Sequence, residues 1–147
     1  RGEAFGAEVK KRILLGSHYL LEENYAKYFI SAQKARRLIS EDFAQVFGSG
    51  SGQVDLLLTP ACLAPAAKLS ETPVDAKAHA QADFFFQAAN LAGIPALALP
   101  LGLVAGLPVG MQLLGPAFSE TKLLNLGHQL QTAHPEHIIF LDKSVKG

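Results

Sequence analysis

Apolar side chains recur at two different spacings along this chain, and the two spacings predict different elements. Between residues 25 and 47 they return every three or four residues, and polar side chains fall largely on the other face. This is the period of a helix that buries one side. We therefore predict an amphipathic helix of about six turns here. A shorter helix with the same period is predicted over residues 7–15, weakened or bent at Gly16.

Short apolar runs bounded by proline and glycine predict the strands. Residues 54–58, 96–99 and 109–114 each form such a run, and the last two are close enough to pair as a hairpin around Gly102 and Gly106. A final short strand is predicted over residues 138–141. Residues 48–52 contain only glycine and serine, which predicts a surface loop.

Two further helices are predicted in the second half of the chain. One covers residues 76–92 and is ended by Gly93. The other runs from Glu120 to about Thr132, with Ser119 as its N-cap. Helices that alternate with short apolar strands indicate an α/β fold with two or three strands and helices on the faces of the sheet.

Composition and charge argue against several classes of function. Lys and Arg number 13, as do Asp and Glu, so the clustered excess of basic residues that a broad nucleic-acid site needs is not expected. No apolar run approaches the ~20 residues of a membrane span, so we expect no membrane partner. The single Cys62 excludes an internal disulfide framework and a cysteine-based zinc cage.

No complete active site can be recognised from the residues alone. The run at 48–52 lies between a helix and a strand, whereas a serine nucleophile elbow needs the order strand, turn, helix. His134 and His137 flank a proline and lack further ligands, so we expect no metal site.

Two charged residues have unusual neighbours. Arg12 adjoins an apolar stretch, and Asp83 opens a run of three phenylalanines. Each is either a solvated surface residue or part of a ligand pocket. An arginine suits a carboxylate and an aspartate suits an ammonium, so the two together would fit a free amino acid.

Five blocks, in order, resemble the amidase signature family. They span nearly the whole chain, and four are continuous: FGAEVKKRILLG (5–16), DLLLTP (55–60), NLAGIPA (90–96) and GLPVGMQLLG (106–115). The fifth is a helical pattern of tyrosine, phenylalanine, arginine and aspartate over residues 25–43. The resemblance implies the C-terminal portion of the family's mixed-sheet α/β/α fold, incomplete by itself, with residues 1–147 forming a partial amidase domain.

Within that family the sequence is similar to the glutamine-hydrolysing A subunits of tRNA-dependent amidotransferases, with mitochondrial-like features at residues 20–29 and 87–90. This resemblance implies B and C partner subunits, glutamine as substrate, and glutamyl-tRNA(Gln) held mainly by the partner. It also implies that the B subunit uses ATP and Mg, and that this chain binds no cofactor. The location would be the mitochondrial matrix in a eukaryote or the cytoplasm in a bacterium.

By the same resemblance, Arg12 matches the arginine that binds the glutamine carboxylate, and Asp83 matches the aspartate that orients the substrate. The family's catalytic Lys, cis-Ser and nucleophilic Ser belong to an N-terminal block with no counterpart here. We therefore expect no catalytic residue in this chain and no activity from it alone. A fragment of a stand-alone amidase acting on another amide, and a non-catalytic interaction piece, remain alternatives.

Overall fold

The computed structural model describes residues 5–50, 52–66 and 84–135. The chain divides into two compact units, residues 1–39 and 40–147, and each is described by itself. Four of the sequence predictions rest on residues outside the described ranges: the start of the helix expected from residue 76, Asp83, His137, and the strand expected at 138–141.

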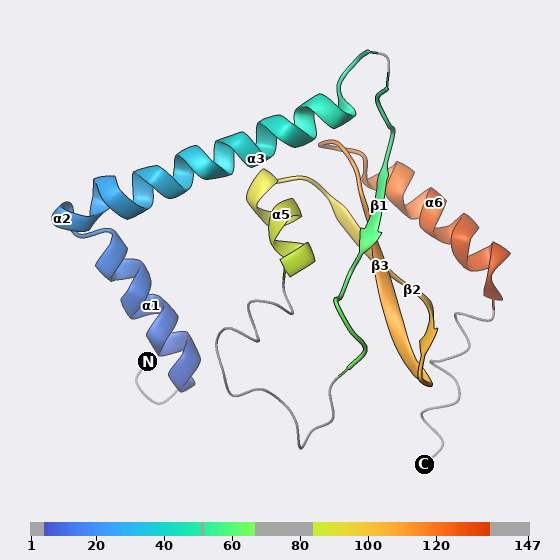
Figure 1. The fold of residues 1–147 in the computed structure, drawn as a ribbon, viewed down its shortest axis with the longest axis horizontal. Helices are drawn as coiled ribbons and strands as arrows, with labels where there is room; N and C mark the ends of the chain where they lie inside the picture. Colours follow the sequence, from blue (N-terminus) through green and yellow to red (C-terminus); the bar gives the residue numbers. More distant parts are fainter. Residues whose placement is uncertain (1–4, 51, 67–83, 136–147) are drawn as a thin grey trace. The chain divides into compact units, whose positions relative to one another are not determined.

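The first unit is helical. It contains α1 (Ala7–Tyr19), α2 (Glu22–Asn24), the π-helix η1 (Tyr25–Ile30) and the beginning of α3 (Ser31–Phe47) (Figure 1). The Asn24 side chain donates a hydrogen bond to the His18 carbonyl at 3.1 Å, and the rings of Tyr19 and Tyr28 lie 5.1 Å apart. These contacts close the corner between α1 and η1.

Two details of this unit differ from the sequence prediction. Helix α1 continues through Gly16 to Tyr19, because a glycine lowers helix stability without preventing helical backbone angles. The long helix begins with a wider π turn before becoming α-helical at Ser31, whose hydroxyl donates to the Ala26 carbonyl five residues earlier. A single wide turn changes the apolar period too little for the sequence pattern to reveal it.

The second unit is built on a three-stranded sheet of order β1-β3-β2. Its strands are β1 (Leu57–Pro60), β2 (Ala96–Val104) and β3 (Leu107–Leu114), and both pairs are antiparallel (Figure 1). Leu113 of the central strand pairs with Leu58 on one side and Leu97 on the other. The predicted α/β class and the hairpin of the last two strands are confirmed.

The strand limits differ from those predicted, because hydrogen bonding rather than hydropathy sets them. The backbone N–H of Val54 donates to the Val46 carbonyl, and β1 starts only at Leu57. Strand β2 continues past Pro100, which an edge strand tolerates. The hairpin turn lies at Ala105 and Gly106, with φ of 52° and 80°, and not at Gly102; positive φ at both positions matches the right-handed twist of paired strands.

Helices α5 (Phe84–Ala92) and α6 (Glu120–Ala133) pack on the two faces of this sheet (Figure 1). Leu99, Leu113 and Leu123 form the buried core between the sheet and α6. Side chains alternate along a strand, so Gln112 faces the opposite side, where it contacts α5.

The ends of these helices agree only in part with the sequence prediction. Helix α5 is ended by Gly93 at φ 73°, as predicted. Ser119 does precede α6, but it makes no side-chain cap; its carbonyl accepts from the Leu123 N–H, and its buried hydroxyl has no partner.

Candidate functional site

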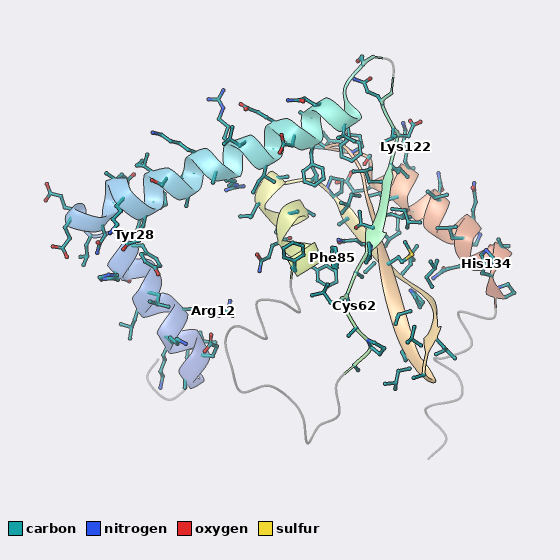
Figure 2. The ribbon with its side chains drawn as sticks, in the orientation of Figure 1. Arg12, Tyr28, Cys62, Phe85, Lys122 and His134 are labelled. Atoms are coloured by element: carbon teal, nitrogen blue, oxygen red, sulfur yellow. The ribbon has the colours of Figure 1, made fainter. Side chains whose placement is uncertain are left out.

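Arg12 lies on the exposed surface of α1 (Figure 2). Its Nε is 3.2 Å from Glu8 Oε1, one helical turn earlier, and both side chains are largely exposed. Exposed pairs of this kind hold their partners weakly. The guanidinium can therefore leave Glu8 to form a two-pronged bond with a carboxylate ligand.

Asp83 lies outside the described residues, so the structure does not show whether it and Arg12 come together. The described chain resumes at Phe84, the first residue of α5.

Gln112, toward the C-terminal end of β3, contacts the start of α5. Its Nε2 is 2.7 Å from the Phe85 carbonyl and 3.4 Å from the Pro60 carbonyl at the end of β1. Three elements therefore meet at one buried amide. The sequence prediction missed this residue, although a glutamine within the apolar run 109–114 is a visible signal.

A second polar contact joins segments that are far apart in the sequence. Lys122 Nζ on α6 lies 2.9 Å from Asp55 Oδ1, just before β1. The hydrogen bond from Lys122, and then its positive charge, lower the pKa of the Asp55 carboxyl. An exposed carboxylate stabilised in its ionised form is a poor proton donor, so this pair suits structure rather than acid–base catalysis.

An apolar hollow of about 310 Å³ lies between the C-terminal part of α3, the end of α5 and the loop before α6. Its lining includes Phe43, Phe47, Ile94 and Pro116, and none of its lining side chains is titratable. Such a hollow can hold an apolar group, and the one hydroxyl in its lining, that of Ser40, donates to the Ala92 carbonyl.

Several serine hydroxyls in the described chain are bound to backbone carbonyls. Ser17 donates to Ile13, and Ser40 donates to Ala92 across from α3 to α5. A hydroxyl engaged in this way helps to fix the backbone, whereas a nucleophilic serine needs a neighbouring base.

Neither a candidate metal site nor a membrane-spanning helix is found in the part of the chain that the structure describes. Those residues contain no group of three His, Cys, Asp or Glu side chains that could hold a metal ion. No helix among them is both long and apolar enough to cross a membrane.

Comparison with known proteins identifies the family. The sequence profile of the family described as Amidase matches residues 1–124. The A subunit of glutamyl-tRNA(Gln) amidotransferase from Azotobacter vinelandii is 50% identical over 137 residues, which cover 93% of this chain and 28% of that protein.

Solved structures give the same result. The A subunit of glutamyl-tRNA(Gln) amidotransferase from Thermotoga maritima superposes with a TM-score of 0.62 at 36% identity, covering 83% of this chain and 26% of that one. The crystal structure of an amidase superposes at 0.67 with 30% identity, covering 90% and 30%.

This chain spans little more than a quarter of the curated relatives it matches. The match nevertheless covers most of the present sequence, and the described α/β elements align with part of each solved neighbour. The chain belongs to the amidase family.

Proposed function

We propose that this chain is the C-terminal part of the glutamine-hydrolysing A subunit of a glutamyl-tRNA(Gln) amidotransferase. The observation that carries the proposal is the 50% identity with one such subunit over 93% of the chain. Other relatives that bear the same name are 44–46% identical over comparable lengths.

The proposed reaction is divided between subunits. The A subunit releases ammonia from glutamine, and the B subunit uses ATP and Mg to activate glutamyl-tRNA(Gln) and accept the ammonia, with a C subunit completing the assembly. The compartment would be the mitochondrial matrix in a eukaryote or the cytoplasm in a bacterium.

The role proposed for this chain is to position glutamine. Arg12 would bind the α-carboxylate through its planar fork, and Asp83 would attract the α-ammonium. Both groups hold the side-chain amide at a fixed distance from the nucleophile, which contributes orientation rather than bond-breaking chemistry.

The nucleophilic Ser, the second Ser and the Lys of this reaction are proposed to lie outside this chain. The serine contacts in the described chain support this division, since Ser17 and Ser40 donate to backbone carbonyls. We therefore expect the purified 147-residue chain to release no ammonia from glutamine. Turnover that disappears on Ser17→Ala would contradict the proposal.

Arg12 and Asp83 together form the proposed glutamine clamp. This clamp is tested in a complete A subunit that carries this sequence, assembled with its B and C partners. Charge-assisted bonds contribute roughly 1.5–3 kcal/mol. Arg12→Lys keeps the charge but loses the fork, so kcat/KM for glutamine should fall by about one to two decades. Arg36→Lys makes the same change on the exposed surface of α3 and should leave kcat/KM for glutamine unchanged.

Free ammonia provides the internal control for this experiment. Ammonium salts bypass glutamine, so formation of amidated tRNA from ammonium should survive both Arg12→Lys and Asp83→Asn. An equal loss with ammonium and with glutamine would make the two residues structural and would remove the clamp from the proposal.

A stand-alone amidase is the second candidate, favoured by the 30% identical solved amidase. Hydrolysis of simple amides by the complete polypeptide without B and C subunits would support it. A requirement for glutamyl-tRNA(Gln) and ATP would support the amidotransferase.

A further inference from the structure

Phe118, in the turn before α6, combines two features that are unfavourable in a free surface residue. Its side chain is 95% exposed, whereas Leu14, the next most exposed large apolar side chain in the described chain, is 70% exposed. Its φ is 63°, in the left-handed region. A bulky side chain is strained there because its Cβ crowds the backbone carbonyl oxygen. An exposed phenylalanine alone needs no explanation, but one that also strains the backbone does.

The turn that contains Phe118 would form more easily with another residue. A hydrogen bond of 3.2 Å from the Ser119 N–H to the Pro116 carbonyl closes this turn. Phe118 is its third residue, where a positive φ favours glycine or asparagine. The ring makes almost no packing contact with the described chain, because it is 95% exposed. The contact that offsets the strain is therefore to be sought outside the described residues.

The apolar hollow of about 310 Å³ adjoins Phe118. Pro116 and Ala117, the two residues that precede Phe118, line it together with phenylalanines of α3. None of the lining side chains carries a charge. A projecting aromatic ring beside an uncharged recess is typical of the central part of a protein–protein contact, and it offers nothing to a nucleic acid or a charged ligand.

The length of related proteins indicates what covers this surface. The chain matches 28% of the A subunit from Azotobacter vinelandii, so almost three quarters of that protein has no counterpart here. The buried apolar cluster of the second unit consists of Leu99, Leu113 and Leu123, which is small for a sheet with helices on both faces (Figure 1). A longer polypeptide buries a larger share of its surface by packing its parts together.

We propose that Phe118 is the anchor on which the rest of the A subunit, outside these 147 residues, packs: that part encloses the Phe118 ring and places an apolar side chain in the adjoining hollow. The inference rests on the proposed function in one respect, that this chain is part of a longer A subunit. Burial of the ring then offsets the strain of its turn, since strained residues persist where surrounding contacts hold them.

Thiol labelling measures whether the rest of the subunit covers this position. Phe118→Cys is made in the 147-residue chain and in a complete A subunit that carries this sequence. Reaction with a maleimide is followed by peptide mass spectrometry, which distinguishes residue 118 from Cys62. Residue 118 should react rapidly in the chain alone. It should react at least about tenfold more slowly in the complete subunit, because the reagent reaches it only when the parts separate.

Removing the ring gives a second test, in which the sign of the effect decides. Phe118→Gly relieves the turn and deletes the ring. In the complete subunit it should lower the melting temperature by at least about 2 °C, because the loss of a buried aromatic side chain outweighs the relief. A ring that stays in water would give a rise. Ala105→Gly is the matched control: Ala105 also has a positive φ, 52°, in an exposed turn, and its replacement should not lower the melting temperature.

Every other result overturns the inference. Equal labelling rates in the chain and the subunit, or a melting temperature that Phe118→Gly leaves unchanged or raises, would mean that Phe118 stays exposed. Slow labelling in the 147-residue chain would assign the cover to the chain itself or, if it sediments as a dimer, to a second copy. Slow labelling only after addition of B and C subunits would assign it to them. Neither measurement uses glutamine, so failure to amidate glutamyl-tRNA(Gln) would contradict the proposed function and leave this inference standing.

Discussion

The two units of this chain bury their apolar side chains to very different extents. In residues 40–147 the sheet and α6 enclose Leu113 and Leu123, each 2% exposed. In the described helices α1, α2 and η1 of residues 1–39, no side chain is buried, and Ile13 and Leu14 of α1 are more than half exposed. Helices alone can satisfy their backbone hydrogen bonds, but stability in water comes mainly from packing an apolar face.

Charge separates the units as well. Residues 1–39 contain eight Lys and Arg against four Asp and Glu, a net charge of +4, and residues 40–147 contain five against nine, a net charge of −4. The zero net charge of the whole chain therefore conceals two units of opposite sign. Composition taken over the full length misses this difference.

Hydrogen exchange of the 147-residue chain should show the largest difference between the units. The amide of Leu113, in the centre of the sheet, exchanges only when the core opens, whereas α1 can open without exposing any buried side chain. We expect protection of β3 to exceed that of α1 by at least about a hundredfold. Equal protection would mean that the two units unfold together.

Truncating a core side chain should destabilise the second unit, whereas the same truncation in the first unit should not. Leu113→Ala removes most of a buried side chain from the cluster with Leu99 and Leu123, which should cost about 2–5 kcal/mol of unfolding free energy. Leu14→Ala makes the same change where the side chain is 70% exposed and should alter stability by less than about 0.5 kcal/mol. Urea titration followed by circular dichroism measures both values.

A matched pair of glycine substitutions should have opposite signs. A Cβ at Gly127 of α6 would lie 2.7 Å from Leu97 Cδ2, and Leu97 is itself packed against the buried core. Displacing Leu97 should cost more than the helix propensity that alanine gains, so Gly127→Ala should destabilise by about 1 kcal/mol. A Cβ at Gly16 of α1 would meet nothing within 4 Å, so Gly16→Ala should stabilise by up to about 1 kcal/mol. Stabilisation by both changes would show that α6 does not pack closely on β2.

The smallest expected effect concerns the contact between Asp55 and Lys122. The hydrogen bond and charge of Lys122 lower the pKa of Asp55, so any stabilisation is present above its unfolded pKa and is lost as the pH falls through the lower folded value. Lys122→Met should shift the Asp55 titration upward by NMR. Because both groups are exposed, the unfolding midpoint should barely change.

Much of the fold was predictable because it depends on local pattern. The periods of α3 and α6, the glycine that ends α5 and the apolar runs of β2 and β3 all act within a few residues. Strand limits were predicted less well, since β1 starts where its pairing with β3 begins, at Leu57 opposite Leu114, and the extension of β2 past Pro100 depends on its place at the edge.

Some residues of the candidate site were likewise predictable from the sequence, and one was not. Arg12 and Asp83 were identified from the sequence by resemblance, and they stay predictions about glutamine binding. Gln112 appeared only in the folded chain, because its partners Pro60 and Phe85 lie 52 and 27 residues away.

Local spacing and ordered motifs were enough to predict most of the helices, the hairpin and the family. Which side chains are buried, the link that Gln112 makes between β1 and α5, and the contact of Asp55 with Lys122 across 67 residues became visible only in the folded chain. Hydrogen bonds and close packing act over a few ångströms in space, and folding brings together groups that the order of residues keeps apart.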